Sequence, residues 1–517
     1  MGQKFYVTTP IYYVNDSPHI GHAYTTIAAD VLARYHRACG HQTWFLTGAD
    51  EHGVKIVKAA AEKGLTPRQL ADSVVVHFQE FWKFLNISND DFIRTSDARH
   101  EKRLQAIMER LLQRDQVYQG KYEGWYDEGQ EEFVTESAAR ENQYQSAISG
   151  KPLVRYSEPS WFFRLSQWRE KLLAYIQAHP EFIRPESRRN EVLSKLADGL
   201  EDLSISRSLA KLDNWGVSLP NDPTHCVYVW IDALSNYITA LGYPPIGQEG
   251  DQGRWDFWPA SLQLIGKDIL WFHTVYWPCL LMALDVPLPR TIFAHGWWTS
   301  EGKKMSKSLG NFVSREVITE LCNEYSRDAF RYFVLREVPF GADGDFSRQA
   351  FQLRYNVDLA NGVGNLLART VNMIGRYFQA QVPQPDPSAG AQPVQQAAEA
   401  LIAAAGPAME QCRFNAYLDK VQDLVNATNK FIDVTEPFKL AKDATQRQRL
   451  GGILYACAEA VRLVLSYLEP FMPDKAAEGL SQLGLAGPRR LDQVGRWGLL
   501  TPGQALGKAA MLFPRKL

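Results

Sequence analysis

The fold is decided by residues 5–22, whose sequence is FYVTTPIYYVNDSPHIGH. The apolar, β-prone run Phe5–Thr9 predicts a strand, and the turn-forming residues 15–18 end it. Ser17 suits the N-cap of a helix, and Pro18 suits its first position. Apolar residues then recur at helical spacing as far as Gly40, which is typical of a helix end. The stretch therefore predicts a strand, a turn and a helix that opens at two histidines.

The alternation of strand and helix continues on both sides of a long interruption. Strands are predicted at Phe5–Thr9, Thr43–Leu46, Cys226–Trp230, Leu262–Ile265 and Thr291–Ala294, and helices at 18–39, 53–63, 67–86 and 99–115. This pattern predicts an α/β fold built on a doubly wound, Rossmann-like parallel sheet. Short alternating runs at 117–133 indicate an insertion, and helical periods dominate after about residue 349.

These patterns divide the chain into five expected segments. They are the first half of a catalytic domain at 1–115, a connective insertion at 116–225, the second half at 226–297, a loop-containing region at 298–350 and an all-α helical bundle at 351–517. The apolar run from Ile269 to Leu284 contains His273 and Pro278 and is short for a membrane span, so we expect a buried helix there.

His19 and His22 share one face at the positive end of the predicted helix. Backbone N–H groups and the helix dipole attract anions there, Gly21 allows close approach, and two imidazoles can donate hydrogen bonds to phosphate. Metal ligation and a core histidine pair are the alternatives. In a doubly wound fold the nucleotide would bind at the carboxyl ends of the strands, near His19, His295 and Gly296.

A second cationic segment lies at residues 304–308, which read KMSKS. Glycines and polar residues flank it and no apolar period runs through it, so a loop is predicted. Lys304 and Lys307 on a pliable loop can stabilise the charge that moves onto a departing pyrophosphate. A solvated lysine turn is the usual fate of such a segment alone, but its occurrence with the histidine pair indicates chemistry on ATP phosphates.

Composition is that of a large globular enzyme, with 45% hydrophobic and 22% charged residues among 517. Since 56 basic residues face 58 acidic ones, binding to nucleic acid must rest on local patches. The six cysteines are far apart and form no CxxC pair, which argues against a disulfide framework and against a cysteine zinc site. No signal or transit pattern is recognised, and we expect a cytoplasmic protein.

Five segments together carry a family resemblance. They are PIYYVN at 10–15, GADEHG at 48–53, YVWIDAL at 228–234, GKDI at 266–269 with Phe272-His273, and the KMSKS loop. With the histidine pair, they make the chain similar to class I aminoacyl-tRNA synthetases and, within that class, to the methionyl-tRNA synthetase family. The resemblance covers nearly the whole length.

The resemblance implies a methionine–tRNA ligase reaction. Methionine and ATP would give methionyl-adenylate and pyrophosphate, and the methionine would pass to the 3′-terminal adenosine of elongator and initiator methionine tRNAs. His19, His22, Lys304 and Lys307 would be the catalytic residues, with Mg²⁺ bridging the phosphates. The implied ATP-binding residues are His19, Gly21, His22, Gly266, Asp268, His295, Gly296, Lys304 and Lys307.

The implied methionine-binding residues are Ile11, Tyr13, Asp50, Trp230, Ala233, Leu234, Tyr237, Ile269 and His273. Asp50 and the backbone around Ile11 would hold the ammonium group. Aromatic walls suit a polarisable, nearly apolar thioether, and Tyr237 or His273 would place a donor near its sulfur. Homocysteine lacks only one methyl group, which an apolar pocket discriminates by about 1–3 kcal/mol, so the resemblance also implies editing within the synthetic site.

In the helical half, Asn361, Asn365 and Arg369 lie at i, i+4 and i+8 on one predicted helix face. Amides and a guanidinium there can read unstacked bases, and the resemblance implies that this face binds the CAU anticodon. A polar face satisfied by neighbouring helices is the alternative. Phe438 stands where many family members have Trp, which gives a smaller stacking surface.

Two further features differ from many members of the family. Residues 124–130 hold no thiolates where those relatives carry zinc knuckles, so no structural zinc is predicted. Asp127, Glu128, Glu131 and Glu132 could bind a hard cation, although clustered acids more often form a solvated face. We expect no appended tRNA-binding domain after the helical half, and we expect a monomer.

Two other functions remain open at this point. A synthetase for another apolar amino acid is disfavoured by the Trp230, Tyr237 and His273 pocket and by the absence of a large editing insertion. A tRNA-binding paralogue without catalysis is disfavoured by the presence of both the histidine pair and the lysine loop.

Overall fold

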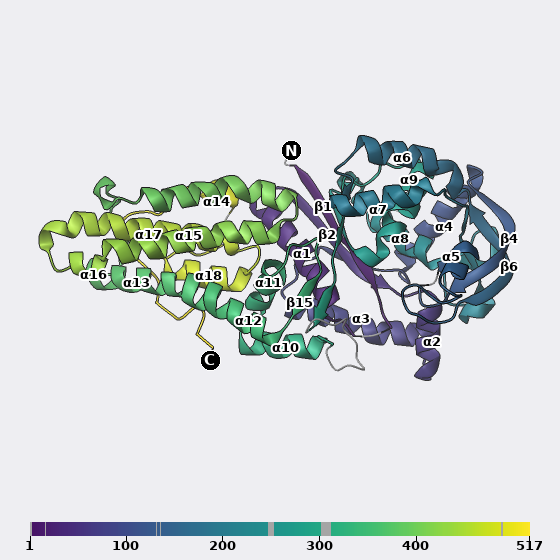
Figure 1. Cartoon of the computed structure of the whole chain (residues 1–517), viewed down its shortest axis with the longest axis horizontal. Coiled ribbons are helices and arrows are strands. Elements are labelled where there is room, and N and C mark those ends of the chain that lie inside the picture. The colour runs from purple at the N-terminus through teal and green to yellow at the C-terminus, as the bar shows by residue number, and fades with distance from the viewer. Residues whose placement is uncertain are drawn as a thin grey trace.

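The computed structural model describes residues 3–15, 17–130, 132–134, 136–246, 253–300, 312–487 and 490–516. It is an elongated molecule with an α/β half and a helical half, and helix α1 lies where the two meet (Figure 1).

A six-stranded parallel sheet organises the α/β half. Its order is β3 (Asp91–Arg94), β2 (Gln42–Asp50), β1 (Lys4–Tyr13), β12 (Leu262–Gly266), β13 (Ile292–His295) and β7 (Ile183–Arg184). The predicted doubly wound sheet is confirmed. The direction of winding reverses between β1 and β12, which is the position where such sheets bind ligands. The edge strand β7 comes from within residues 116–225 and has too few residues to give a sequence pattern.

The helices around the sheet follow the sequence pattern closely. They are α1 (Ile20–Ala38), α2 (Val54–Glu62), α3 (Pro67–Phe84) and α4 (Ala98–Gln113), followed after the insertion by α8 (Val229–Thr239) and α9 (Trp277–Ala283). The predicted buried helix between 269 and 284 is confirmed, with a π-helical segment at Phe272–Tyr276 ahead of α9.

The predicted start of the first helix was wrong. The N-cap is His19 rather than Ser17, and Pro18 precedes the helix instead of opening it. His19 is held extended because its backbone bridges to Ser314, and Ile20 N–H donates to the carbonyl of Val313 at 3.1 Å. The helix therefore begins at Ile20.

The predicted strand at Cys226–Trp230 was also wrong as a member of the parallel sheet. Strand β11 (Asp222–Val227) ends before Tyr228 and pairs antiparallel with β9 (Ser206–Ser208) and β10 (Ser218–Leu219). Trp230 already lies in α8. A short continuous apolar run does not distinguish a buried strand from the first turn of a buried helix.

The rest of the insertion is a four-stranded antiparallel sheet with helices beside it. Its strands are β4 (Val117–Asp127), β5 (Glu132–Val134), β6 (Val154–Phe163) and β8 (Leu203–Ser204), and its helices are α5 (Glu136–Glu141), α6 (Arg169–Ala178) and α7 (Glu186–Ala197).

A short two-stranded sheet and three helices lead into the helical half. The strands are β14 (Trp298–Ser300) and β15 (Gly344–Phe346), and the helices are α10 (Arg315–Glu324), α11 (Arg327–Arg336) and α12 (Arg348–Arg354). A π-helical segment, Tyr355–Gly364, then runs into α13 (Asn365–Phe378). The bundle is completed by α14 (Gln392–Glu410), α15 (Phe414–Thr435), α16 (Pro437–Leu440), α17 (Arg447–Leu468), α18 (Pro473–Gln482) and α19 (Leu491–Val494).

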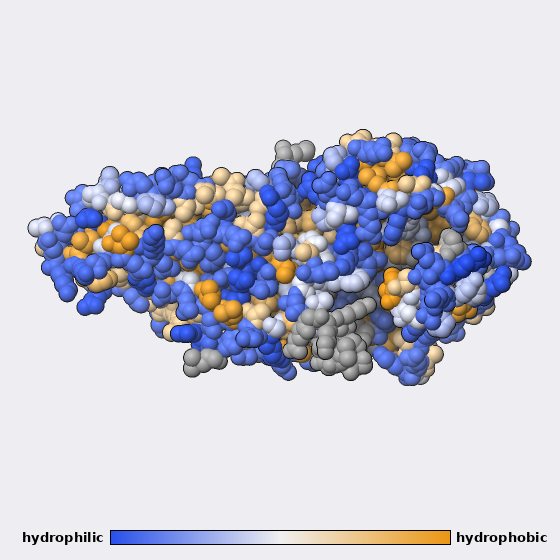
Figure 2. All heavy atoms as spheres, in the orientation of Figure 1, coloured by the Kyte–Doolittle hydropathy of each residue, from blue (hydrophilic) through white to orange (hydrophobic). Residues whose placement is uncertain are grey.

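Helix α17 is long and apolar enough to cross a membrane by composition, but that stretch is wholly buried inside the bundle. The face shown in Figure 2 is mostly hydrophilic, with apolar patches scattered over both halves.

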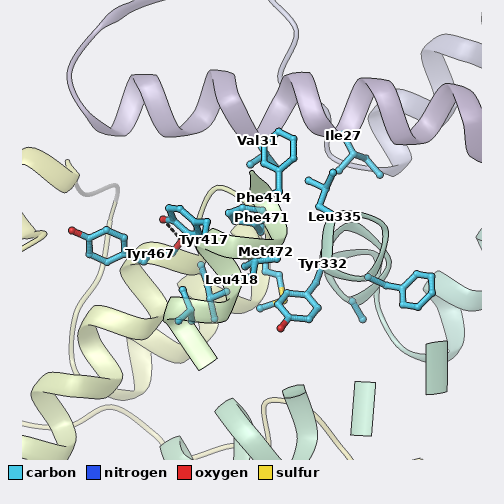
Figure 3. Packing of buried hydrophobic residues seen from close by; sticks show 14 of the residues in the cluster. Ile27, Val31, Tyr332, Leu335, Phe414, Tyr417, Leu418, Tyr467, Phe471 and Met472 are labelled. Atoms are coloured by element: carbon cyan, nitrogen blue, oxygen red, sulfur yellow. Dashed lines mark hydrogen bonds between the residues drawn. The ribbon is translucent and has the colours of Figure 1, made fainter. Parts of the chain in front are cut away.

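A continuous apolar core joins the two halves. Ile27 and Val31 of α1 point toward residues of α11, α15 and the segment after α17, including Leu335, Phe414 and Phe471 (Figure 3). The helix that carries the histidine pair is therefore packed on the helical bundle as well as on the sheet.

One buried ion pair lies beside this core. The fully buried guanidinium of Arg331, on α11, donates to Asp30 of α1 at 2.7 Å. It also donates to the carbonyls of Leu85, Pro470 and Phe471. The charges of Arg331 and Arg34 outweigh burial and lower the pKa of Asp30.

Replacement of Arg331 with Met should therefore destabilise the chain strongly, by about 3–5 kcal/mol, because a buried carboxylate and three carbonyls lose their donor. Urea denaturation followed by circular dichroism measures the shift. The matched control is Arg348→Met, whose partner Glu320 is exposed and whose loss should cost less than about 1 kcal/mol. Equal shifts for the two variants would contradict the stabilising role assigned to the buried Arg331–Asp30 contact.

Candidate active site

A cleft of about 530 Å³ opens at the carboxyl ends of β1, β12 and β13, beside the point where the winding of the sheet reverses. It is lined by Pro10, Ile11, Tyr12, Tyr13, Asn15, Ser17, His19, Gly21, His22, Thr25, Asp50, Trp230, Ala233, Leu234, Tyr237, Gly266, Asp268, Ile269, His273, His295, Trp297 and Phe312. All nine residues of the expected methionine pocket and six of the expected ATP-binding residues thus border one cavity.

The histidine pair lies at the N-terminus of α1, with ring centroids 3.9 Å apart. His19 Nδ1 accepts a hydrogen bond from Gly21 N–H at 3.0 Å, and His22 Nδ1 accepts one from His19 N–H at 3.2 Å. Since both Nδ1 atoms are acceptors, each neutral ring carries its proton on Nε2. Burial, and then the neighbouring His19, lower the pKa of His22 well below its usual value. The pair therefore offers N–H donors on the Nε2 atoms, and His22 is held in its neutral form.

Gly21 lies between the two histidines and is needed there for space. A Cβ at this position would come within 2.9 Å of the His19 ring. The described aromatic neighbours of the two rings are Tyr12, Phe78 and Phe312, which make tilted and edge contacts with them.

The other end of the cleft is an aromatic pocket between α8 and the π-helical segment. Trp230 stacks on Phe272 with ring centroids 3.6 Å apart, and its Nε1 donates to the carbonyl of Gln130 at 3.4 Å. Tyr237 OH lies 2.8 Å from His273 Nε2, and His273 Nδ1 lies 3.0 Å from the carbonyl of Ile269.

These contacts settle where the protons of the pocket lie. A carbonyl only accepts, so His273 carries its proton on Nδ1, and its Nε2 accepts the hydroxyl proton of Tyr237. Burial lowers the pKa of His273 to about 4, so the ring is neutral near pH 7. The pocket therefore offers aromatic surface and a hydroxyl oxygen, and both expected donors are engaged within the protein.

The register of β1 and β2 places the residues between the two ends. Ile11 pairs with Gly48 and Tyr13 with Asp50, so side chains from both strands reach the cleft at the same level. Asp50 is only 4% exposed. Its carboxyl group borders the same cleft as the aromatic pocket and the histidine pair.

The expected ATP-binding residues after β12 and β13 have clear local roles. Asp268 Oδ1 accepts from Trp297 Nε1 at 2.9 Å, and a Cβ on Gly266 would meet this oxygen at 2.5 Å. His295 Nδ1 donates to the carbonyl of Gly296 at 2.7 Å, and its Nε2 lies 2.6 Å from the Thr25 hydroxyl. Burial lowers the pKa of His295.

Gly296 does not line the cleft. A Cβ there would lie 2.2 Å from the carbonyl of Ala342, so the absence of a side chain allows the chain to pass the turn at 339–343. Seven other residues, by contrast, border the cavity and were not among the expected site residues: Pro10, Tyr12, Asn15, Ser17, Thr25, Trp297 and Phe312. Thr25 gave a usable signal, because it follows Gly21 by one helical turn.

Lys304 and Lys307 lie outside the described residues. Phe312 is the first described residue after them, and its ring centroid lies 5.1 Å from that of His19.

The expected anticodon residues lie in the helical half, remote from the cleft in sequence. Asn361 and Asn365 are exposed, and Phe438 on α16 is 49% exposed. Arg369 is half-buried and pairs with Asp433 of α15 at 2.7 Å. Apolar patches occur toward the end of the helical half that carries α16 (Figures 1 and 2).

No group of three or more His, Cys, Asp or Glu side chains suited to a metal occurs within the described parts of the chain. In the insertion, Asp127 Oδ1 accepts from the backbone of Gly129 at 2.8 Å, and Glu128 pairs with Lys58 at 2.6 Å. Glu131 lies outside the described residues, and nothing is described of the Glu132 side chain. The absence of zinc stays a prediction.

Comparison with known proteins identifies the family. The model for class I tRNA synthetases (M) matches residues 5–142 and 140–371. A methionine–tRNA ligase of Caldanaerobacter subterraneus is 46% identical over all of this chain and 79% of its own length, and one of Rickettsia bellii is 44% identical over all of this chain and 99% of its own. The chain belongs to the methionine–tRNA ligase family.

Solved structures of the methionine–tRNA ligase family agree with this assignment. Mycobacterium tuberculosis methionyl-tRNA synthetase in complex with methionyl-adenylate superposes with a TM-score of 0.92 at 40% identity, over 99% of this chain and 100% of that one. The ligand-free form of that enzyme gives a TM-score of 0.86 at 36% identity, over 100% of this chain and 99% of that one. The family, the fold class and the enzymatic reaction expected from the sequence are thereby confirmed.

Tyr237→Phe tests the aromatic pocket. Without the hydroxyl, the buried Nε2 of His273 loses its donor, at a cost of about 1–3 kcal/mol. The KM for methionine in ATP–pyrophosphate exchange should rise by about tenfold, while the KM for ATP stays unchanged.

Tyr118→Phe is the matched control for this variant, since Tyr118 gives its hydroxyl proton to Asp202 in the insertion, away from the cleft. An unchanged KM for methionine in Tyr237→Phe would contradict the assignment of Tyr237 to the methionine pocket.

Proposed function

We propose that this cleft activates L-methionine with ATP and then transfers it to tRNA. The methionine carboxylate attacks the α-phosphorus, the bond to the pyrophosphate oxygen breaks, and methionyl-adenylate forms. A ribose hydroxyl of the terminal adenosine of tRNA then attacks the acyl carbon, and AMP leaves. One observation carries the proposal: a single cavity joins two imidazole N–H donors at a helix N-terminus to an aromatic pocket.

The phosphates occupy the end of the cleft at the start of α1. His19 and His22 donate from Nε2 to phosphate oxygens, where the helix dipole adds to their effect. Gly21 lets a phosphate approach the backbone. Lys304 and Lys307 neutralise the departing pyrophosphate, which lowers the barrier because the negative charge grows as the bond breaks.

Mg²⁺ belongs with ATP in this proposal. The described part of the cleft offers no cluster of three ligands for a metal, and phosphate oxygens are ligands that Mg²⁺ accepts readily. The ion is thus a counter-ion of the triphosphate, and the steps assigned to the protein side chains are binding and orientation.

Methionine occupies the other end of the cleft. Its thioether lies against Tyr237, His273 and the stacked Trp230, whose surfaces suit a polarisable group. Asp50 pairs with the ammonium group, which leaves the carboxylate pointing toward the histidines. Ile11, Tyr13, Ala233, Leu234 and Ile269 complete the walls. No covalent intermediate with the protein is required.

The helical half is proposed to bind the anticodon of elongator and initiator methionine tRNAs. Exposed Asn361 and Asn365 offer amide groups, Arg369 offers a guanidinium held by Asp433, and Phe438 offers a stacking surface. We further propose that the protein works as a monomer in the cytoplasm.

Amino-acid-dependent ATP–pyrophosphate exchange tests the reaction. All twenty amino acids are assayed without tRNA, and only methionine should support exchange. Lys307→Ala should reduce the methionine-dependent rate by about 100-fold or more, as loss of one group that stabilises developing charge usually does. Lys211→Ala, which alters a lysine paired with Glu158 in the insertion, is the control. Exchange with another amino acid would overturn the pocket, and no exchange would favour a noncatalytic tRNA-binding paralogue.

Arg369→Ala tests the anticodon face. Aminoacylation of methionine tRNA should lose about 10–100-fold in kcat/KM, whereas exchange without tRNA stays unchanged. Arg376→Ala, on the last turn of the same helix, is the matched control. Equal losses in the two reactions of Arg369→Ala would indicate structural damage instead of lost recognition.

A further inference from the structure

A buried polar cluster lies on the face of α8 that is turned away from the cleft. Asp232, only 1% exposed, accepts hydrogen bonds from His52 Nδ1 at 2.7 Å and from His100 Nε2 at 2.6 Å. His100 Nδ1 also lies 2.7 Å from the hydroxyl of Thr239. The mechanism proposed above uses none of these four side chains.

Helical spacing places the cluster opposite the methionine pocket. Trp230, Ala233, Leu234 and Tyr237 recur at i, i+3, i+4 and i+7 and face the cleft. Asp232 and Thr239 are two turns apart on the other face of α8. His100, on the first turn of α4, contacts both of them and so fixes the helix at both ends.

His52 ties the same helix to the end of β2. It follows Asp50, which borders the cleft, and Glu51, which is fully buried and pairs with Arg94 at 2.5 Å. Three consecutive residues thus connect the cleft, strand β3 and helix α8. A shift of α8 against β2 would change the gap between Asp50 and the pocket that holds the thioether.

We propose that His52, Asp232 and His100 act together as positioning residues, which fix α8 against β2 and α4 and thereby set the affinity of the cleft for methionine. The proposal rests on the assignment of the methionine pocket to α8. It predicts that disturbing the cluster raises the KM for methionine and leaves the KM for ATP unchanged.

The charges around the cluster add a dependence on pH. Burial opposes the cationic form of His52, but Asp232, with help from Glu101 and Glu51, outweighs it and raises the pKa of His52. Burial opposes the ionised form of Asp232 as well, but the two histidines lower its pKa to about 2. Glu101 also faces Arg68, and Cys226 lies on the strand before α8.

The two pKa shifts determine how methionine binding changes with pH. The charged pair is complete once Asp232 has ionised, and it is lost as the pH rises through the raised pKa of His52. Methionine should therefore bind best on the acidic side of that pKa, and its KM should rise with pH on the alkaline side.

Asp232→Asn is the direct test. The amide keeps the size of the carboxylate, but its NH₂ group faces an imidazole N–H, so one buried donor loses its acceptor. In ATP–pyrophosphate exchange, the KM for methionine should rise at least about tenfold, with the KM for ATP within about twofold of wild type. His100→Gln keeps a donor toward Asp232, so it should raise the KM for methionine less than Asp232→Asn does. Asp222→Asn removes the carboxylate of the His225 pair in the insertion and should leave the KM for methionine unchanged.

The pH profile separates positioning from a merely structural role. The KM for methionine is measured from roughly pH 6 to roughly pH 9 in wild type and in His52→Gln, and their ratio cancels the ionisation of methionine itself. The ratio of the KM for methionine in His52→Gln to that in wild type should fall toward one at alkaline pH. A constant ratio would overturn the proposal, even where Asp232→Asn fails to fold.

Two other outcomes would also overturn the positioning proposal. They are a folded Asp232→Asn with the wild-type KM for methionine, and parallel increases in the KM values for methionine and ATP. If Tyr237→Phe also leaves the KM for methionine unchanged, the pocket assignment itself fails. If Tyr237→Phe raises that KM and Asp232→Asn does not, only the positioning role fails.

Discussion

The buried contact between Arg331 and Asp30 holds together the two halves on which this enzyme depends. It joins α11 to α1 and reaches the end of α17 through two backbone carbonyls. The apolar cluster of Figure 3 surrounds the same junction. Because α1 also carries the histidine pair at its N-terminus, the phosphate end of the cleft is fixed relative to the helical bundle. A site that activates an amino acid and a surface proposed to bind an anticodon are thus parts of one packed body.

Burial and capping determine the chemistry of the cleft. Each of its four histidines engages Nδ1 with the backbone, but the direction of the bond differs. In His19 and His22 the ring accepts, so Nε2 keeps the proton that is proposed to bind phosphate. In His273 and His295 the ring donates, so Nε2 becomes an acceptor for a hydroxyl inside the protein. One residue type therefore supplies donors at the phosphate end and structural acceptors elsewhere.

Local pattern predicted much of the fold, and contacts distant in sequence account for the rest. Four strands of the parallel sheet (β1, β2, β12 and β13) and the helices from 18 to 115 followed from periodicity, because apolar spacing reports directly on which face is buried. The short strands β3 and β7 were not predicted. The first helix starts later than predicted because His19 pairs with Ser314, far along the chain. The apolar run at 226–230 was assigned to a strand because a short continuous apolar run does not distinguish a buried strand from the first turn of a helix.

The candidate site, too, was predicted in part from the sequence. The histidine pair and its phosphate chemistry followed from residue types and spacing, whereas the methionine pocket came from the family resemblance, since aromatic residues alone are more often core. The position of Trp297 in the cleft and the contacts of Asp232 with His52 and His100 were not predicted, because the partners lie in other segments of the chain. Gly296 was assigned to the cleft on its position beside His295, but the structure gives it a packing role.

A crystal structure with a non-hydrolysable methionyl-adenylate analogue would test the central claim, that one cleft holds methionine and ATP at opposite ends, most directly. The account predicts the sulfur in contact with Tyr237 and His273, the ammonium group at Asp50, and the phosphate-mimicking group within hydrogen-bonding distance of Nε2 of His19 or His22. An analogue bound with its methionine side chain outside the pocket between α8 and the π-helical segment would contradict it.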